Sequence, residues 1–378
     1  MTFTVWRSPL RSPWLTSVLG VVLLVLFALV IVTGFLSHAA YMPDLPHNAI
    51  VPAGRDLPLT FGWPTSPSWL YALTQGVHTN AGLVAIPFLL AKLWSVIPKL
   101  FEYPPVKGLG HAVERLSVAL LVSSAGFQLA TGVVNAQYWY PFKFNFVVAH
   151  YYGAIVFTAA LVLHVIVKVP AMRRARATRA ELPTAQLTLS RRGLFAFTTA
   201  GALTLLAANA GQSLGGPFRR LALFAPRREA FPVNKTARAA GVTAAMVGPS
   251  YRLALRGIDA TSLSREQLLA LPQRTARLPI ACVEGWTTTQ EWTGVSLALL
   301  AEHAGAPGAR ELHVESLQPR GVLRQASLSG AQIAAGLLAL RVNGEDLPLD
   351  HGFPARIVVP ALPGVHNTKW VSALTFRS

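Results

Sequence analysis

The nine residues Leu278-Pro-Ile-Ala-Cys-Val-Glu-Gly-Trp286 include Cys282, the only cysteine in a chain of 378 residues. The stretch is rich in β-forming residues and lies in the more polar, C-terminal part of the sequence. With no second cysteine, the chain can form neither an intramolecular disulfide nor a zinc site built from several thiolates. Three interpretations of the thiol stand at this point: a lone soft ligand to a metal, a nucleophile, or core filling.

The composition separates the chain into two parts. Hydrophobic residues make up 52% of the sequence and charged residues only 13%, and the apolar excess is confined to roughly the first 215 residues. The formal net charge is +17, but the basic residues concentrate beside apolar runs, where membrane topology explains them without nucleic acid. We therefore expect a membrane domain followed by a globular one, and no nucleic-acid partner.

Five apolar runs have the length of membrane-spanning helices, which need about 20 residues each. They occupy residues 14–38, 69–97, 112–136, 145–169 and 194–214. The first four predict an all-α membrane bundle in residues 1–170. Residues 171–215 are expected to hold a basic loop and a fifth, linking helix, and residues 216–378 the globular domain.

Positive charges next to the apolar runs predict the orientation of the helices. Loops rich in lysine and arginine face the cytoplasm, and these include Arg7, Arg11, Lys99, Lys107, Arg115 and the run from Lys168 through Arg173, Arg174, Arg176 and Arg179 to Arg192. The opposite loops carry chiefly Arg55 and Lys143. The pattern predicts a multi-pass protein of the plasma membrane, in contact with lipid, with a cytoplasmic N-terminus and a periplasmic or extracellular C-terminal domain.

The fifth run begins Ser190-Arg191-Arg192-Gly193-Leu194-Phe195, which resembles the twin-arginine signal that exports folded proteins. The alternative is a pair of ordinary arginines at the cytoplasmic end of a helix. Export after folding is the interpretation that suits a domain whose cofactor is inserted in the cytoplasm.

Histidines within the apolar runs are candidates for haem ligands, because an uncoordinated imidazole is costly in lipid. His150 and His164 are fourteen positions apart, which places them on nearly one helix face and about 21 Å apart. His78 and His150 fall at similar depth and form a plausible axial pair for an outer haem b. For an inner haem, His164 would pair with His111, and Arg115 would bind a propionate, while His38 is a spare ligand.

These histidines resemble those of the b-type cytochrome subunits of formate dehydrogenases and nickel hydrogenases. The resemblance covers roughly residues 10–170 and lies in the two histidines of the fourth helix, which in that family joins two haems. An inner ligand from the first helix, expected in the formate dehydrogenase cytochromes, has no counterpart here. The resemblance implies one haem b or two, and electron exchange with quinone or quinol.

The C-terminal part alternates short strands and helices from Phe231 onward. Strands are expected at 251–257, 279–283, 312–316, 340–342 and 355–359, and helices at 264–270 and 296–303. The pattern predicts a mixed α+β domain. It contains no glycine-rich dinucleotide motif.

Four separated motifs in this part resemble the molybdopterin-binding domain of the sulfite oxidase superfamily. They are Cys282-Val-Glu-Gly-Trp286, Glu291-Trp-Thr-Gly-Val-Ser-Leu297, His351-Gly-Phe-Pro-Ala-Arg356 and Pro363-Gly-Val-His-Asn-Thr-Lys-Trp370. The resemblance covers nearly all of residues 225–378 and implies a molybdenum ion held by a single molybdopterin. It implies that Cys282 is the protein ligand to molybdenum.

The resemblance also implies roles for other residues. The pterin phosphate would be held by His366, Asn367, Thr368 and Lys369, and His351 and Arg356 would lie close to the pterin. Asn234 resembles a cofactor contact of the periplasmic methionine sulfoxide reductases. The alternatives are a turn asparagine at Asn234 and a surface histidine at His351. Trp286 and Trp292 are predicted, with Cys282, as the catalytic residues, forming walls of the substrate pocket, although a tryptophan in a β domain is more often core.

The residues after the cysteine favour the reductase branch. True sulfite oxidases have a glycine-asparagine-arginine segment there, whereas this chain has Glu284, Gly285 and Trp286. We expect a membrane-anchored molybdenum oxidoreductase that transfers an oxygen atom to or from a small substrate, a sulfoxide or N-oxide rather than sulfite. The alternative is a haem-only electron conduit or binding scaffold whose outer domain holds no metal.

Overall fold

The computed structural model describes residues 8, 10–41, 61–104, 106–177, 190–227 and 229–378. The chain separates into two compact units. The helical unit comprises Met1–Phe35 and Val77–Ala210, and the C-terminal unit comprises Leu36–Gly76 and Gly211–Ser378. The C-terminal unit therefore includes the end of the first long helix and the beginning of the second, which the sequence analysis had assigned to the membrane domain alone.

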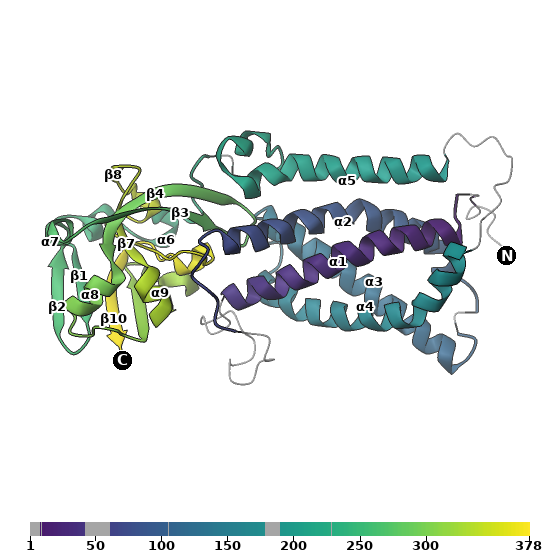
Figure 1. Ribbon diagram of the computed structural model, residues 1–378, viewed down its shortest axis with the longest axis horizontal. Helices are drawn as coiled ribbons and strands as arrows, with labels where there is room; N and C mark the ends of the chain where they lie inside the picture. The colour runs from purple at the N-terminus through teal and green to yellow at the C-terminus, as the bar shows by residue number, and fades with distance from the viewer. Residues whose placement is uncertain (1–7, 9, 42–60, 105, 178–189, 228) are drawn as a thin grey trace. The chain divides into compact units, whose positions relative to one another are not determined.

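Five long apolar helices are present, as the sequence predicts: α1 Pro13–Tyr41, α2 Leu70–Leu100, α3 Leu109–Ala136, α4 Phe146–Ala177 and α5 Arg191–Leu214 (Figure 1). Each is long and apolar enough to cross a membrane. The five predicted apolar helices are confirmed, and within the described residues they are candidate membrane spans by their length and composition. Three charges used to predict orientation, Arg7, Arg55 and Arg179, lie outside the described residues.

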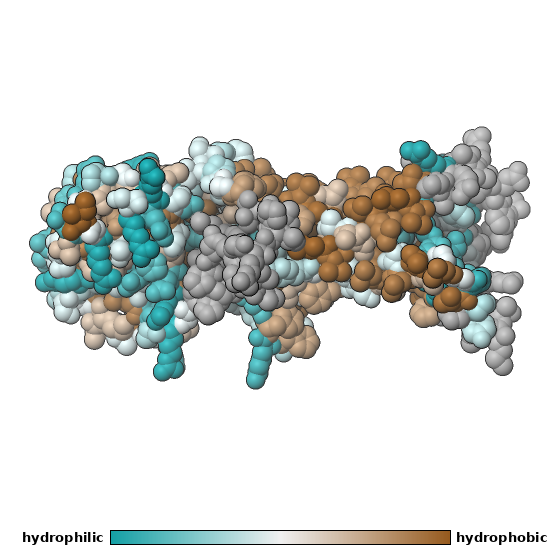
Figure 2. All heavy atoms as spheres, turned by 90° about the horizontal axis from the view of Figure 1, so that it is seen from below, coloured by the Kyte–Doolittle hydropathy of each residue, from teal (hydrophilic) through white to brown (hydrophobic). Residues whose placement is uncertain are grey.

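The helical unit is apolar both inside and outside. Leu19, Phe27 and Phe157 belong to its buried core, where the rings of Phe27 and Phe157 meet edge to face at 5.0 Å. Large apolar side chains also point outward, among them Leu116, Ile166 and Phe197. Brown, apolar side chains accordingly cover much of the face of this unit that Figure 2 shows. A helix that is apolar all round suits lipid as its solvent.

The C-terminal unit contains two five-stranded sheets. The first has the order β2-β1-β10-β5-β6, in which β1 and β10 pair in parallel and the other neighbours are antiparallel. Its strands are β1 Arg252–Arg256, β2 Ala260–Ser264, β5 Glu311–Ser316, β6 Gln325–Ser329 and β10 Val371–Arg377.

The second sheet has the order β3-β4-β7-β8, and β9 pairs with β7. Its strands are β3 Arg274–Ala281, β4 Thr287–Ser296, β7 Leu337–Val342, β8 Glu345–Asp346 and β9 Arg356–Val358. Three short helical segments precede β1: η3 Gly216–Leu221, α6 Ala237–Ala240 and η4 Ala244–Val247. Other short helical segments lie between strands: α7 Arg265–Ala270, α8 Leu297–His303, η5 Val322–Arg324, α9 Gly330–Ala335, η6 Leu349–His351 and η7 Gly364–His366.

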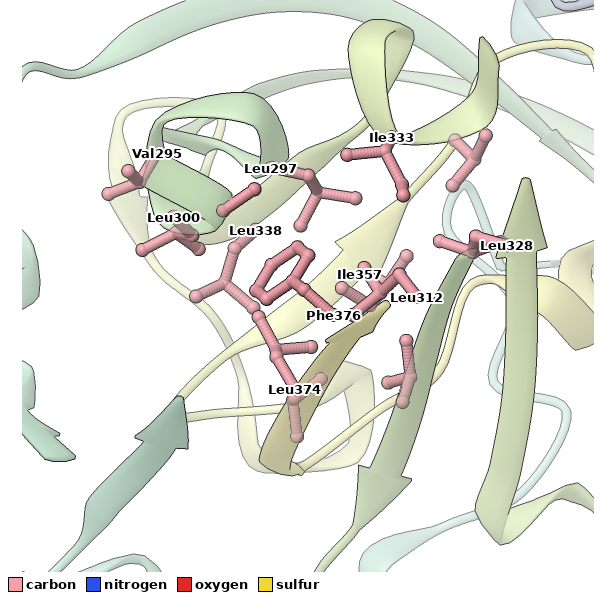
Figure 3. Packing of buried hydrophobic residues seen from close by; sticks show 14 of the residues in the cluster. Val295, Leu297, Leu300, Leu312, Leu328, Ile333, Leu338, Ile357, Leu374 and Phe376 are labelled. Carbon is pink, nitrogen blue, oxygen red and sulfur yellow. The ribbon is translucent and has the colours of Figure 1, made fainter. Parts of the chain in front are cut away.

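Serine caps begin three of these helices. Ser264 and Ser329 each form a capping box with the glutamine three residues on, and Ser296 accepts a hydrogen bond from the amide of Leu299. Side chains of α8, α9 and both sheets then point toward one another in a shared core (Figure 3). This core, with Leu312, Leu338 and Leu374 fully buried, confirms the predicted α+β domain.

Candidate active site

Cys282 occupies the turn between β3 and β4. Its amide donates to the carbonyl of Trp286 at 2.9 Å, and its carbonyl accepts from the amide of Gly285 at 3.0 Å. Gly285 has φ +94°, a conformation that residues with a Cβ rarely adopt. The two strands pair throughout their length, from Arg274 opposite Gly294 to Ala281 opposite Thr287, so a long hairpin carries the thiol at its tip.

The Cys282 thiol is buried. Only 5% of the residue is exposed, and it packs with Trp286, Trp292 and neighbouring aliphatic side chains. Burial raises the pKa of the thiol well above its usual value, and the carboxylate of Glu284 raises it further. The free thiol is therefore not an activated nucleophile at neutral pH. A bound cation would reverse this balance, because a metal stabilises the thiolate directly.

Glu284 is engaged within the same turn. Its Oε2 accepts a hydrogen bond from the indole nitrogen of Trp286 at 2.9 Å and lies 3.5 Å from Nε of Arg227. Arg227 also donates to the carbonyls of Val233 and Asn234. The Glu284–Arg227 pair ties the tip of the hairpin to the chain segment that precedes α6, an anchor that the sequence analysis did not identify.

An aromatic stack brings the second and third predicted motifs together. The ring of Phe231 stacks on His351 at 3.6 Å and meets Trp292 edge to face at 5.6 Å. The guanidinium of Arg356 lies 5.5 Å from the centre of the Trp292 ring and donates to the carbonyl of His351 at 3.1 Å. Trp292 is fully buried and its indole donates to the carbonyl of Leu278, so it supports the site from within the core. Phe231 was not predicted as a site residue.

Two buried cations lie beside this stack without a carboxylate partner. In the described part of the chain, neither Arg356 nor Lys369 forms an ion pair. Lys369 donates instead to the carbonyls of Lys235 and Asp350, at 2.7 and 2.8 Å. Gly352 brings the two cations together, since a Cβ there would lie 3.1 Å from Cβ of Arg356 and 3.2 Å from Cβ of Lys369.

The pKa values of these groups reflect burial without a counterion. Burial lowers the pKa of Lys369 to about 6, with Arg356 adding to the effect, and lowers the pKa of Arg356 to about 9. The pKa of His351 falls to about 4, first through burial and then through Arg356. An anion held among these side chains would favour their charged forms. The chemistry of the group therefore suits a phosphate.

The last predicted motif contributes two buried polar atoms, Nδ1 of His366 and Oγ1 of Thr368, that have no hydrogen-bond partner among the residues the structure describes. Burial also lowers the pKa of His366 to about 4, and its other ring nitrogen lies 3.1 Å from the carbonyl of Tyr41. The side-chain oxygen of Asn367 accepts a hydrogen bond from the amide of Val359, which fixes the loop that contains Asn367.

This motif lies beside the cysteine hairpin, because Pro363 forms a parallel bridge with Ala281, the residue before the thiol. The structure thus brings Cys282 and the Pro363–Trp370 motif to one place. Buried polar atoms without a partner are what a polar ligand would satisfy. The residues present therefore fit molybdopterin as a ligand, with Cys282 as the soft donor that a high-valent molybdenum accepts.

Asn234 is placed at the edge of the same region. Its side-chain oxygen accepts from the amide of Lys235 at 3.0 Å, and its carbonyl accepts from Arg227. The local hydrogen bond is that of a turn asparagine, while the neighbouring Lys235 carbonyl binds Lys369. A cofactor contact of Asn234 stays a prediction.

In the helical unit, the rings of His78 and His150 meet edge to face, with 6.0 Å between their centroids and 81° between their planes. Nδ1 of His78 lies 3.0 Å from the carbonyl of Val30, and Nδ1 of His150 lies 2.8 Å from Oγ1 of Thr131. Both rings therefore use Nδ1 for orientation and leave Nε2 for a ligand, the usual arrangement of metal-binding histidines. Gly34 makes room, since a Cβ there would lie 2.9 Å from Cε1 of His78.

The predicted inner pair is not in ring contact in the described residues. Nδ1 of His111 accepts from the amide of Lys107 at 3.2 Å, and His164 lies in α4. Arg115 donates to the carbonyls of Lys99 and Leu100 and so caps the end of α2. His38 lies near the end of α1, in the part assigned to the C-terminal unit. These haem assignments stay predictions.

Comparison with known proteins identifies the C-terminal part. Residues 240–378 match the family described as the oxidoreductase molybdopterin binding domain. This part of the chain is thus similar to a sulfite oxidase-type molybdopterin-binding domain. The domain holds Cys282, His351, Arg356 and the Pro363–Trp370 motif within the matched range.

Individual proteins similar to parts of this chain also bear the names of oxidoreductases. Mitochondrial sulfite oxidase of Rattus norvegicus is 32% identical over 160 residues, 34% of this chain and 29% of the rat protein. The uncharacterized oxidoreductase YuiH of Bacillus subtilis is 35% identical over 118 residues, 30% of this chain and 58% of that protein. The putative protein-methionine-sulfoxide reductase subunit YedZ1 of Azospira oryzae is 28% identical over 127 residues, 33% of this chain and 48% of that protein. The chain thus spans between 29% and 58% of the length of these relatives.

Proposed function

We propose that this chain is a membrane-anchored molybdenum oxidoreductase, which transfers an oxygen atom at an extracytoplasmic molybdopterin site and exchanges electrons with the quinone pool through b haem. The observation that carries the proposal is a group of residues near Cys282, in a part of the chain that matches the molybdopterin-binding family. Within the described residues, this group contains two buried cations without an ion-pair partner and two buried polar atoms without a hydrogen-bond partner.

Each residue of the group has its own role in binding the cofactor. Cys282 supplies the thiolate, and its hairpin tip keeps the sulfur buried among Trp286 and Trp292, where water is excluded. Arg356 and Lys369 hold the phosphate charge, and the side chains of His366 and Thr368 complete the hydrogen bonds. When bound, molybdopterin supplies a molybdenum ion able to exchange an oxygen atom and two electrons with a substrate.

A neutral oxide is the substrate we favour. In the balanced reaction, a sulfoxide takes up two electrons and two protons and yields a thioether and water. The Glu284 carboxylate acts on Cys282 electrostatically, and this charge disfavours a sulfite anion at the sulfur-bound metal. The relative from Azospira oryzae is named a putative protein-methionine-sulfoxide reductase subunit, which supports the same choice, whereas the rat relative is named a sulfite oxidase.

The electron carrier we propose is a haem b between His78 and His150. Support comes from the proximity of the two rings, whose centroids are 6.0 Å apart, and from the Nδ1 hydrogen bonds that orient both imidazoles. A second haem would take His111 and His164 as its ligands. Quinone or quinol would be the partner in the membrane, and the positive-inside pattern supports a C-terminal domain on the periplasmic side.

The test follows haem oxidation in the purified, full-length chain. The haem is reduced anaerobically without excess reductant, and methionine sulfoxide, trimethylamine N-oxide or sulfite is then added. Reoxidation by the sulfoxide or N-oxide in wild type but not in Cys282→Ser supports the proposal. Haem that none of these compounds reoxidises, in a chain containing no molybdenum, would support the electron-conduit alternative instead.

A further inference from the structure

Three consecutive carbonyl oxygens at the tip of the cysteine hairpin accept hydrogen bonds from side chains of two long helices. Gln75 of α2 donates to the carbonyl of Val283 at 2.9 Å. Gln212 of α5 donates to the carbonyl of Glu284 at 3.2 Å, and Ser213 donates to the carbonyl of Gly285 at 2.9 Å. All of these residues belong to the C-terminal unit.

These contacts complete the hydrogen bonding of the turn. The carbonyls of Cys282 and Trp286 already accept backbone amides within the turn, so the three side chains supply a donor for each carbonyl between them. Side chains of α2 and α5 thus supply donors to three carbonyls in succession. The turn is therefore completed by α2 and α5 and not by the β domain alone.

The donors are themselves held in place. Gln75 is 6% exposed and Gln212 is 2% exposed. Oε1 of Gln75 accepts a hydrogen bond from Ser37 at 2.9 Å, which fixes the direction of its amide. A Cβ at Gly76 would lie 3.1 Å from Cβ of Ser213, so the glycine permits the close approach of the two helix ends. Fixed donors on rigid elements position a site more accurately than a free loop does.

The chain continues this contact along the start of β4. A Cβ at Gly215 would lie 2.8 Å from the carbonyl oxygen of Thr287, and the guanidinium of Arg219 donates to the same oxygen at 3.3 Å. The segment from Gln212 to Arg219 thus follows the hairpin for four residues, from Glu284 to Thr287. Such an extended contact restricts rotation of the turn about any one hydrogen bond.

We propose that Gln75, Gln212 and Ser213 are positioning residues that clamp the Cys282 turn and so fix the direction of its sulfur toward molybdenum. The orientation of the sulfur toward molybdenum rests on the function proposed above. The restriction of the turn by the three side chains does not, because it concerns the mobility of the turn in the chain itself. Orientation of a ligating side chain by its surroundings is a general means of tuning a metal.

The single cysteine makes the mobility of the turn measurable. The full-length chain is produced in a host unable to make molybdopterin, and its reaction with a thiol reagent is timed in detergent below the unfolding temperature. A buried thiol reacts only when its surroundings open, so the labelling rate reports the local opening equilibrium. The test variants are Gln75→Met and Gln212→Met, which keep side-chain length without the amide donor, and the milder Ser213→Ala.

Gln332→Met is the matched control. Gln332 is buried to a similar degree, with 3% exposed, but its side chain completes the capping box of α9. Loss of a donor to a buried carbonyl is expected to raise the Cys282 labelling rate roughly five- to tenfold in each test variant. The control is expected to lower the thermal midpoint and leave the labelling rate unchanged.

A second readout uses the molybdenum-loaded chain. The test variants are expected to retain molybdenum but shift the g-values of the Mo(V) electron paramagnetic resonance signal, which the control leaves as in wild type. Equal labelling in wild type and test variants, or a rise that the control shares, would overturn the clamp. A wild-type chain without molybdenum would refute the proposed function and leave the labelling result standing.

Discussion

Replacement of Lys369 by methionine tests the unpaired cations of the site. Burial lowers the pKa of this lysine from its usual value of 10.5 to about 6 in the cofactor-free chain. At neutral pH the folded domain has therefore lost a proton that the unfolded chain still binds. Stability must rise with pH wherever the unfolded state binds more protons. For one proton, the gain from about pH 7 to about pH 8.5 is roughly 2 kcal/mol.

This pH range isolates the lysine from its neighbours. His351 and His366, with pKa values of about 4 in the folded domain and 6.5 ordinarily, act below it. Arg356, with a pKa of about 9, acts above it. The Cys282 thiol, whose pKa burial raises from 9, has an opposite effect that develops chiefly at higher pH.

The assay is the thermal midpoint of the C-terminal unit in the cofactor-free, full-length chain, followed by tryptophan fluorescence. For a domain of this size, roughly 2 kcal/mol corresponds to a rise of about 4 to 8 °C across the range. Lys369→Met is expected to abolish the rise and to be more stable than wild type at pH 7. Lys235→Met, which removes a lysine bonded to Gln318, is the control and should keep the wild-type rise. A wild-type midpoint independent of pH would refute the reasoning, as would a rise that Lys369→Met retains.

Three further outcomes are expected. Arg356→Met should retain haem, but its molybdenum content should be at least tenfold lower than in wild type, because the variant lacks a charge-assisted hydrogen bond to the phosphate. Metal analysis measures the molybdenum and an optical spectrum the haem; equal molybdenum content in the two proteins would contradict this role. His150→Leu should abolish the reduced b-type absorption band while leaving molybdenum in place, and an unchanged band would exclude His150 as the axial ligand. Gly285→Ala should lower the thermal midpoint by several degrees, because the φ of +94° costs a residue with a Cβ about 1 to 3 kcal/mol; an unchanged midpoint would show that the turn adapts.

The fold could be predicted from sequence where local patterns are strong. Five uninterrupted apolar runs gave the five long helices, and alternation over 251–257 gave β1, because one face of that strand is buried. Strands β2, β4, β6, β8 and β10 were not predicted. β2 is largely exposed, and buried and exposed residues do not alternate along it. β4 begins with the polar residues Thr287-Thr-Thr-Gln290 and ends in a more buried segment. The inclusion of residues 36–76 in the C-terminal unit depends on contacts such as the Trp63 indole with the Ala361 carbonyl, which no local pattern reveals.

The candidate site followed from motifs, but its supporting contacts did not. Cys282, Arg356 and Lys369 lie in motifs whose residues the fold brings together. The partners Arg227 and Phe231 lie more than fifty residues before the groups they contact, and nothing in their own surroundings marks them. A signal was present for Glu284, since an acidic residue beside a buried cysteine requires a cation or a donor nearby.

The claim that Cys282 binds molybdenum is tested most directly by X-ray absorption at the molybdenum edge, in wild type and Cys282→Ser of the full-length chain. The account predicts about one molybdenum per wild-type chain and one sulfur neighbour fewer around molybdenum in the variant. Identical sulfur coordination in the two proteins, or a wild-type chain without molybdenum, would contradict it.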